Sequence, residues 1–291
     1  MNHILPVINN HIKAYEQPRR RALSSRFPVL VKPIVFTKKK VRQVKNNFSL
    51  PKLKSGPFLN SVLARHSSLL YRKLGDSDSQ LQVNKVTNLK IAISKLNGLI
   101  IPPGATFSLW HALGDTSPTK GYVEGMLLSN GQVSTGIGGG LCQLSNFLLW
   151  IFLHTDVEVV ERYHHSVDAF PDFGRTLPFG SGATILCNYI DLQLKNISTQ
   201  PLQIKLWLTD TCLKGQILSD RPAEVKFHLA EKNHYFIKKG IKYFRFNEIY
   251  REVYKMGVKI KEEKLFTNFA PVVYPVDEQY IKDRNYDLIT L

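Results

Sequence analysis

The sequence predicts an α+β protein with a largely antiparallel sheet and a few helices. Of the 291 residues, 43% are hydrophobic and 21% are charged, which is typical of a globular chain with a substantial core. The chain contains 18 glycines, 15 prolines, 16 phenylalanines and 12 tyrosines, which favours a strand-rich or mixed fold over a helical bundle. Alternating polar and apolar residues, clearest over residues 224–229, indicate half-buried antiparallel strands.

Residues 1–57 are expected to form an irregular basic arm. They contain 13 Lys or Arg and a single acid, Glu16, which gives a net charge of +12. Such a segment favours an anionic membrane surface, whereas specific nucleic-acid binding is not expected. The alternative is a solvated arm that lies over the body. Residues 58–291 are then expected to make one domain, with core motifs over residues 85–220 and a strand-rich part over residues 221–291.

Local patterns place the elements of this domain. Near-helical spacing of leucines predicts a helix within residues 58–74, and a clearer repeat of three and four predicts a helix over residues 85–97. Apolar side chains on nearly all faces predict a buried helix over residues 141–154. Strands are expected at residues 99–101, 106–110, 157–162, 184–190, 202–209, 214–219, 224–229, 235–239 and 242–246.

A glycine-rich loop leads into the buried helix with the sequence Gly-Gly-Gly-Leu-Cys-Gln over residues 138–143. The three glycines at the helix start would leave N–H groups unpaired, and the helix dipole would lower the thiol pKa of Cys142. Phosphate binding is a rival use of such a loop. The Lys and Ser or Thr of a P-loop are missing, however, as is the glycine pattern of a dinucleotide site.

Two adjacent histidines, His164 and His165, follow the strand after this helix. A cysteine at a helix start and a histidine on a neighbouring strand can act as nucleophile and base, with a third polar group orienting the imidazole. Because neighbouring residues of a strand face opposite sides, only one histidine can point at Cys142. The alternative is a structural cysteine packed against glycines, with histidines bonded to backbone. Candidates for the orienting group are Asp168, Asp172 and Gln143.

These motifs resemble the VanW family. The resemblance covers residues 85–220 and is carried by residues 138–143, Glu161-Arg162, His165-Ser166, Pro171-Asp172 and Pro178-Phe179-Gly180. It implies a cell-envelope or peptidoglycan context connected with glycopeptide resistance, and it leaves the reaction open. The motif residues expected to line a binding site are Gly138, Gly139, Gly140, Gln143, Glu161, Arg162, Ser166 and Arg175.

Two functional hypotheses follow. The first is a thiol-dependent hydrolase or acyl transferase acting on a peptide or amide group of a cell-wall precursor. In it, Cys142 is the nucleophile, His165 or His164 the base, and the glycine N–H groups hold the oxyanion. The second is a non-catalytic module that binds a peptidoglycan fragment or a protein partner. No metal or cofactor is expected, because no ligand spacing is recognisable.

The expected location is the cytoplasm, with the basic arm allowing peripheral attachment to the inner face of the membrane. No run of about 18 apolar residues is present, and residues 1–18 do not resemble a secretory signal. The three cysteines, Cys142, Cys187 and Cys212, are accordingly expected to be reduced thiols.

Overall fold

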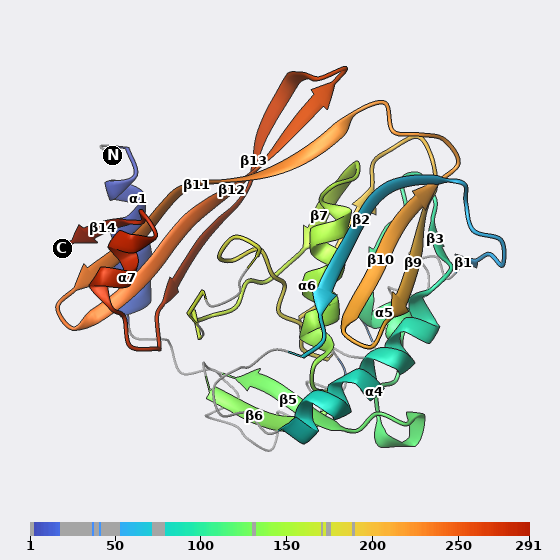
Figure 1. Ribbon diagram of the computed structural model, residues 1–291, viewed down its shortest axis with the longest axis horizontal. Helices are drawn as coiled ribbons and strands as arrows, with labels where there is room; N and C mark the ends of the chain where they lie inside the picture. Colours follow the sequence, from blue (N-terminus) through green and yellow to red (C-terminus); the bar gives the residue numbers. More distant parts are fainter. Residues whose placement is uncertain are drawn as a thin grey trace.

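The computed structural model describes residues 3–17, 37, 41, 53–71, 79–129, 132–169, 171–172, 176–187 and 190–291. These residues contain five α-helices and 14 strands (Figure 1). The strands form four sheets, in which almost every strand pair is antiparallel. The α+β class predicted from the sequence is therefore confirmed.

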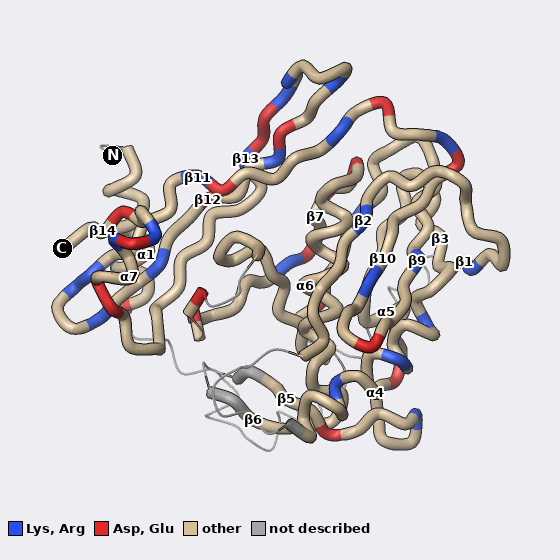
Figure 2. The backbone as a smooth tube through the Cα atoms, in the orientation of Figure 1, with Lys and Arg blue, Asp and Glu red and all other residues tan. Residues whose placement is uncertain are grey.

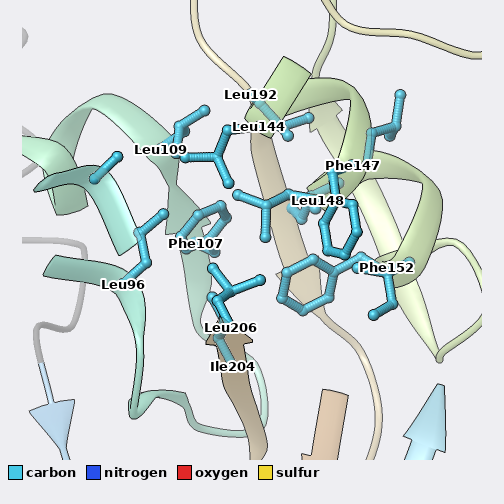
Figure 3. Close-up of a cluster of buried hydrophobic side chains, with 14 of the residues drawn as sticks. Leu96, Phe107, Leu109, Leu144, Phe147, Leu148, Phe152, Leu192, Ile204 and Leu206 are labelled. Atoms are coloured by element: carbon cyan, nitrogen blue, oxygen red, sulfur yellow. The ribbon is translucent and has the colours of Figure 1, made fainter. Parts of the chain in front are cut away.

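The five-stranded sheet has the strand order β1-β3-β9-β10-β2. Helix α6 (Leu141–Phe152) contacts β2 and β10, and helix α4 (Ser79–Leu96) contacts β9. Apolar side chains of the sheet and helices meet in one large core, part of which is shown in Figure 3. The five strands are β1 (Leu53–Lys54), β2 (Ser61–Leu69), β3 (Leu99–Ile101), β9 (Leu202–Leu208) and β10 (Cys212–Ser219).

The prediction of a helix within residues 58–74 is wrong, because the chain forms strand β2 there. Arg65, Ser67 and Leu69 are exposed, whereas Ala64 is buried in the core. The strand pairs antiparallel with β10, from Leu69 opposite Cys212 to Ser61 opposite Ser219. Pairing with a long neighbouring strand thus outweighs the weak helical spacing of the leucines.

Two smaller sheets lie beside this core. One has the order β4 (Thr106–Ser108), β8 (Gln193–Asn196), β7 (Val157–Glu161), and the other pairs β5 (Glu124–Ser129) with β6 (Gln132–Ile137). The strand predicted over residues 106–110 ends early because the side chain of Ser108 accepts a hydrogen bond from His111 N and caps α5 (Leu109–Leu113). In the segment predicted as a strand over residues 184–190, the described residues form only isolated bridges.

The four-stranded sheet is long and strongly twisted (Figure 1), with the order β13-β12-β11-β14. The two strands predicted over residues 224–229 and 235–239 form one strand, interrupted by a register shift between Lys232 and Tyr235. Asn233 within that shift has a φ of 52°. Strand β14 runs parallel to β11 and follows the short helix α7. The elements are β11 (Lys226–Lys239), β12 (Lys242–Lys255), β13 (Val258–Pro271), α7 (Glu278–Asp283) and β14 (Asp287–Thr290).

Helix α1 (Leu5–Glu16) packs on this sheet, so the expectation of an irregular arm is wrong for residues 5–16. Ile4, Ile8 and Ile12 recur at a spacing of four and are buried in a second core with aromatic residues of β11 and β12. Most of residues 18–52 lie outside the described residues, so membrane attachment through them stays a prediction. No described helix is long and apolar enough to cross a bilayer.

Candidate functional site

Cys142 lies in the first turn of α6, as predicted, and its partly buried side chain packs against the large core. Gly140 begins the helix with a left-handed φ of 91°, which a residue with a side chain rarely adopts. Burial raises the pKa of the Cys142 thiol, and a hydrogen bond with the backbone of Ile185 only partly offsets this effect. The pKa shift is therefore opposite to the one expected from the helix dipole, and its main cause is desolvation of the thiolate.

The N–H groups of the glycine loop are paired, and the expectation that they are free is wrong. Gly138 N donates to Val123 O at 3.0 Å, and Gly139 N donates to Gly136 O at 3.1 Å. Gly140 N donates to Met126 O at 2.9 Å. A loop that returns its N–H groups to its own hairpin cannot direct them at an oxyanion without rearranging.

The glycines are needed for packing of backbone on backbone. A Cβ built on Gly139 would lie 2.1 Å from the carbonyl carbon of Gly125, and one on Gly125 would lie 2.6 Å from the carbonyl oxygen of Gly139. The buried amide of Asn88 on α4 holds this contact by donating to Gly139 O at 2.9 Å and Val123 O at 3.0 Å. The glycine density in the sequence thus marks a tight hairpin against α4.

His165 contacts the same extended segment as Cys142, but through a different residue. Its Nδ1 lies 2.9 Å from Thr184 Oγ1, and Thr184 N donates to Tyr163 O at 2.7 Å. Ala183 and Ile185, on either side of Thr184, are 0% and 8% exposed and belong to the core next to α6. Cys142 thus bonds the backbone of Ile185 and His165 bonds the side chain of Thr184, so the two groups contact neighbouring residues of one segment.

The other histidine of the pair, His164, lies at the surface. Its Nδ1 is 2.7 Å from the carbonyl oxygen of His165. Desolvation by the surrounding atoms lowers the pKa of the His164 ring despite this hydrogen bond. Ser166, the next motif residue, is exposed. Neither His164 nor Ser166 is drawn into the core around α6.

Asp168 and Asp172 lie in a buried ion-pair network centred on Arg245 of β12. The Arg245 guanidinium is 1% exposed and donates to Asp168 Oδ2 at 3.1 Å and to the two Asp172 oxygens at 2.8 and 2.5 Å. The phenols of Tyr274 and Tyr286 donate to Asp168 and Asp172 at 3.0 and 3.2 Å. Burial alone would lower the pKa of Arg245, but the hydrogen bonds and charges of Asp172 and Asp168 raise it. The two carboxylates thus anchor the segment after His165 to the four-stranded sheet.

The remaining motif residues also make structural contacts. Gln143 donates to Ser68 Oγ at 3.0 Å and to Leu69 O at 2.7 Å, and Glu161 Oε1 accepts from Asp191 N at 2.9 Å. Arg162 donates to the carbonyl oxygens of Gly180 and Gly182, and burial lowers its pKa to about 10. Arg175 lies outside the described residues.

A groove that the sequence analysis missed lies on the outer face of the five-stranded sheet. It has a volume of about 420 Å³ and is lined by side chains of β2, β9 and β10, including Arg65, Trp207 and Lys214. The sequence does contain a pattern that could have indicated this groove. Polar or aromatic side chains recur at every second position, at Lys205 and Trp207 on β9 and at Lys214 and Gln216 on β10, so they share one face of the sheet. Among the described residues, no group of three or more His, Cys, Asp or Glu side chains could hold a metal ion.

Comparisons with known proteins identify relatives of this chain. The family model described as "VanW like protein" matches residues 84–218. "Vancomycin B-type resistance protein VanW" of Enterococcus faecalis is 33% identical over 211 residues, which cover 72% of this chain and 77% of that protein. "Uncharacterized protein YoaR" of Bacillus subtilis is 25% identical over 166 residues, covering 55% of this chain and 52% of that protein. No solved structure is significantly similar. The chain therefore belongs to the VanW family.

Proposed function

We propose that this protein is a non-catalytic module of the cell envelope that binds a peptidoglycan fragment or precursor, in the context of glycopeptide resistance. The context rests on its relative in Enterococcus faecalis, which carries a vancomycin resistance name. The observation that supports the binding role is that the expected orienting carboxylates and the expected oxyanion donors hold the fold together. Asp168 and Asp172 neutralise Arg245, and the glycine N–H groups close the β5–β6 hairpin.

A thiol enzyme acting on a peptide or amide group of a cell-wall precursor is the second candidate. The observation in its favour is that Cys142 and His165 both contact residues 183–185. Two observations weigh against it. The thiol has a raised pKa, so little thiolate is present near neutral pH, and its hydrogen-bond partner is the backbone of Ile185 rather than an imidazole. Nucleophilic catalysis requires an activated thiol within reach of its base.

The deciding experiment is a comparison of Cys142→Ser and His165→Ala in a strain whose glycopeptide tolerance depends on this gene. A binding module should keep its tolerance with both variants, because Ser preserves the volume of the helix start and His165 is only half-buried. A thiol enzyme should lose tolerance with either variant and lose no more with both, since nucleophile and base act as one unit.

Stability must be measured alongside tolerance. Cys187→Ser is the matched control, because Cys187 is an exposed cysteine whereas Cys142 is partly buried. Loss of tolerance in Cys142→Ser or His165→Ala at an unchanged melting temperature would overturn the binding role. A lowered melting temperature would instead assign the loss to folding, in which case Cys142→Ala and His165→Gln, read at a temperature where both are folded, decide the question.

A further inference from the structure

The five-stranded sheet has an unusual charge pattern. Its strands contain four basic residues, Lys54, Arg65, Lys205 and Lys214, and no Asp or Glu. In the four-stranded sheet, by contrast, basic and acidic side chains alternate in ion pairs such as Lys232–Glu262 and Lys264–Glu248. Figure 2 shows this mixture of signs along β11 to β13. The five-stranded sheet thus differs in having no acidic residue on its own strands to pair with its basic ones.

Three of these basic residues share the outer face of the sheet. Strand pairing sets Arg65 opposite Gln216 and Gln216 opposite Lys205, while Lys214 lies one step along β10 on the same face. Neighbouring strands are about 5 Å apart and same-face neighbours along a strand about 7 Å apart, so the three residues form a triangle with sides on the order of 10 Å. Arg65 and Lys214 form no ion pair with any described residue.

Aromatic side chains lie beside this triangle. Strand pairing sets Trp207 opposite Lys214, and the Lys205 ammonium lies 6.0 Å from the centre of the Trp207 ring. The same ammonium is 4.9 Å from the centre of the Phe58 ring. An indole offers a flat apolar face on which the CH groups of a sugar ring can pack, while its surroundings stay polar. The groove of about 420 Å³ is lined by Trp207 together with Arg65 and Lys214, and Lys205 lies opposite Gln216, another lining residue.

We propose that this groove binds an anionic saccharide, with its phosphate or carboxylate groups on Arg65, Lys205 and Lys214 and a sugar ring on Trp207. The inference rests on the proposed function, because it names the ligand class of the same binding module. Two or more basic side chains around one anion provide charge-assisted hydrogen bonds, which are stronger than neutral ones. A single-stranded nucleic acid would call for a row of aromatic platforms, whereas β9 presents a single indole.

Cys212 provides a built-in reporter of this groove. It lies on β10 next to Lys214 on the same face, and strand pairing sets it opposite Leu69. Hydrogen bonds from Ser67 and Thr211, together with the charge of Lys214, lower its thiol pKa. A ligand bound to Lys214 should neutralise that charge and cover the thiol, which slows alkylation of Cys212.

The test measures alkylation of Cys212 in a Cys187→Ser background, with three sugars and one salt as probes. N-acetylglucosamine 6-phosphate and N-acetylmuramic acid should both slow the reaction, and the relative size of their effects distinguishes phosphate from carboxylate recognition. Neutral N-acetylglucosamine should have no effect. Inorganic phosphate should bind more weakly than the sugar phosphate, because it has no ring to place on Trp207.

Variants then locate the binding. Direct titration, for instance by calorimetry, should show that Arg65→Met and Lys214→Met each weaken binding of the sugar phosphate by about tenfold. Trp207→Ala should weaken the sugar phosphate and leave inorganic phosphate unchanged. Lys226→Met, which removes an exposed lysine of β11, is the matched control and should bind normally.

Three outcomes would overturn the inference: no protection of Cys212 by either anionic sugar, equal protection by neutral N-acetylglucosamine, or tighter binding of a short single-stranded oligonucleotide. These outcomes are separate from the failure of the proposed function. If Cys142→Ser abolishes tolerance while the anionic sugars still bind, the module is an enzyme and the groove stands. If Cys142→Ser keeps tolerance and no sugar binds, the binding module stands and its ligand site lies elsewhere.

Discussion

Replacing Arg245 with Met should destabilise the protein in a pH-dependent way. Arg245, Asp168 and Asp172 are 1%, 3% and 3% exposed, so the substitution leaves two carboxylates buried next to each other without a counter-charge. Removing one partner of a buried ion pair typically costs about 3–5 kcal/mol, which corresponds to a fall in melting temperature on the order of 10 °C. Thermal or urea unfolding followed by circular dichroism measures the loss.

The pH dependence identifies the cause of this loss. Without Arg245, burial and mutual repulsion favour the protonated form of the two carboxyl groups, so the variant should recover part of its stability, relative to wild type, as pH falls from neutral to about 5. The triple variant Arg245→Met, Asp168→Asn, Asp172→Asn should lose less stability than the single one and should not show this pH effect. Lys238→Met, which breaks an exposed ion pair between β11 and Glu278 of α7, should change little. A single variant as stable as wild type at neutral pH, or equally unstable at both pH values, would refute this reasoning.

Three further predictions concern packing and thiol reactivity. Gly139→Ala should lower the free energy of unfolding, measured by urea titration, by about 1–3 kcal/mol or more, because the new methyl group meets the Gly125 backbone. Gly56→Ala is the control and should be neutral, since a methyl group there meets open space. Cys212 should be alkylated faster than Cys142 at neutral pH in the native protein, because the pKa of Cys212 is lowered and that of Cys142 is raised. Mass spectrometry of timed samples measures the two rates, and equal rates would contradict this order. Ile8→Asp should expose α1 to proteolysis by placing a charge in the second core, whereas Val7→Asp, at a position 37% exposed, should leave cleavage unchanged.

Much of the fold could be predicted from the sequence where a pattern was local. The helix after the triglycine and the strand at residues 99–101 follow from apolar runs that begin after a glycine, and the strand at residues 157–161 follows from its valines. Strand β2 was taken for a helix because its leucines also fit a helical spacing, and only pairing with β10 selects the strand. Residues 258–271 were missed, since the polar and charged β13 depends on β12 for its hydrogen bonds.

The candidate site was harder to predict because it depends on contacts between distant residues. The sequence correctly placed Cys142 at a helix start, but the direction of its pKa shift depends on how far the folded protein desolvates the thiol. Asp168 and Asp172 looked available for catalysis because their partner, Arg245, follows 77 and 73 positions later. The groove depends on the register of three strands, which no local pattern specifies.

The docking of α1 has a consequence for the order in which the protein folds. Its ion pair between Glu16 and Lys239 joins residues 223 positions apart, and the aromatic floor beneath Ile8 comes from β11 and β12. Contacts of such long sequence separation form late, because a large loop must close before they gain any energy. During synthesis, the apolar side of α1 therefore stays uncovered until more than two hundred further residues have left the ribosome. The second core is completed only when the last strands are made, which exposes the nascent chain to aggregation until then.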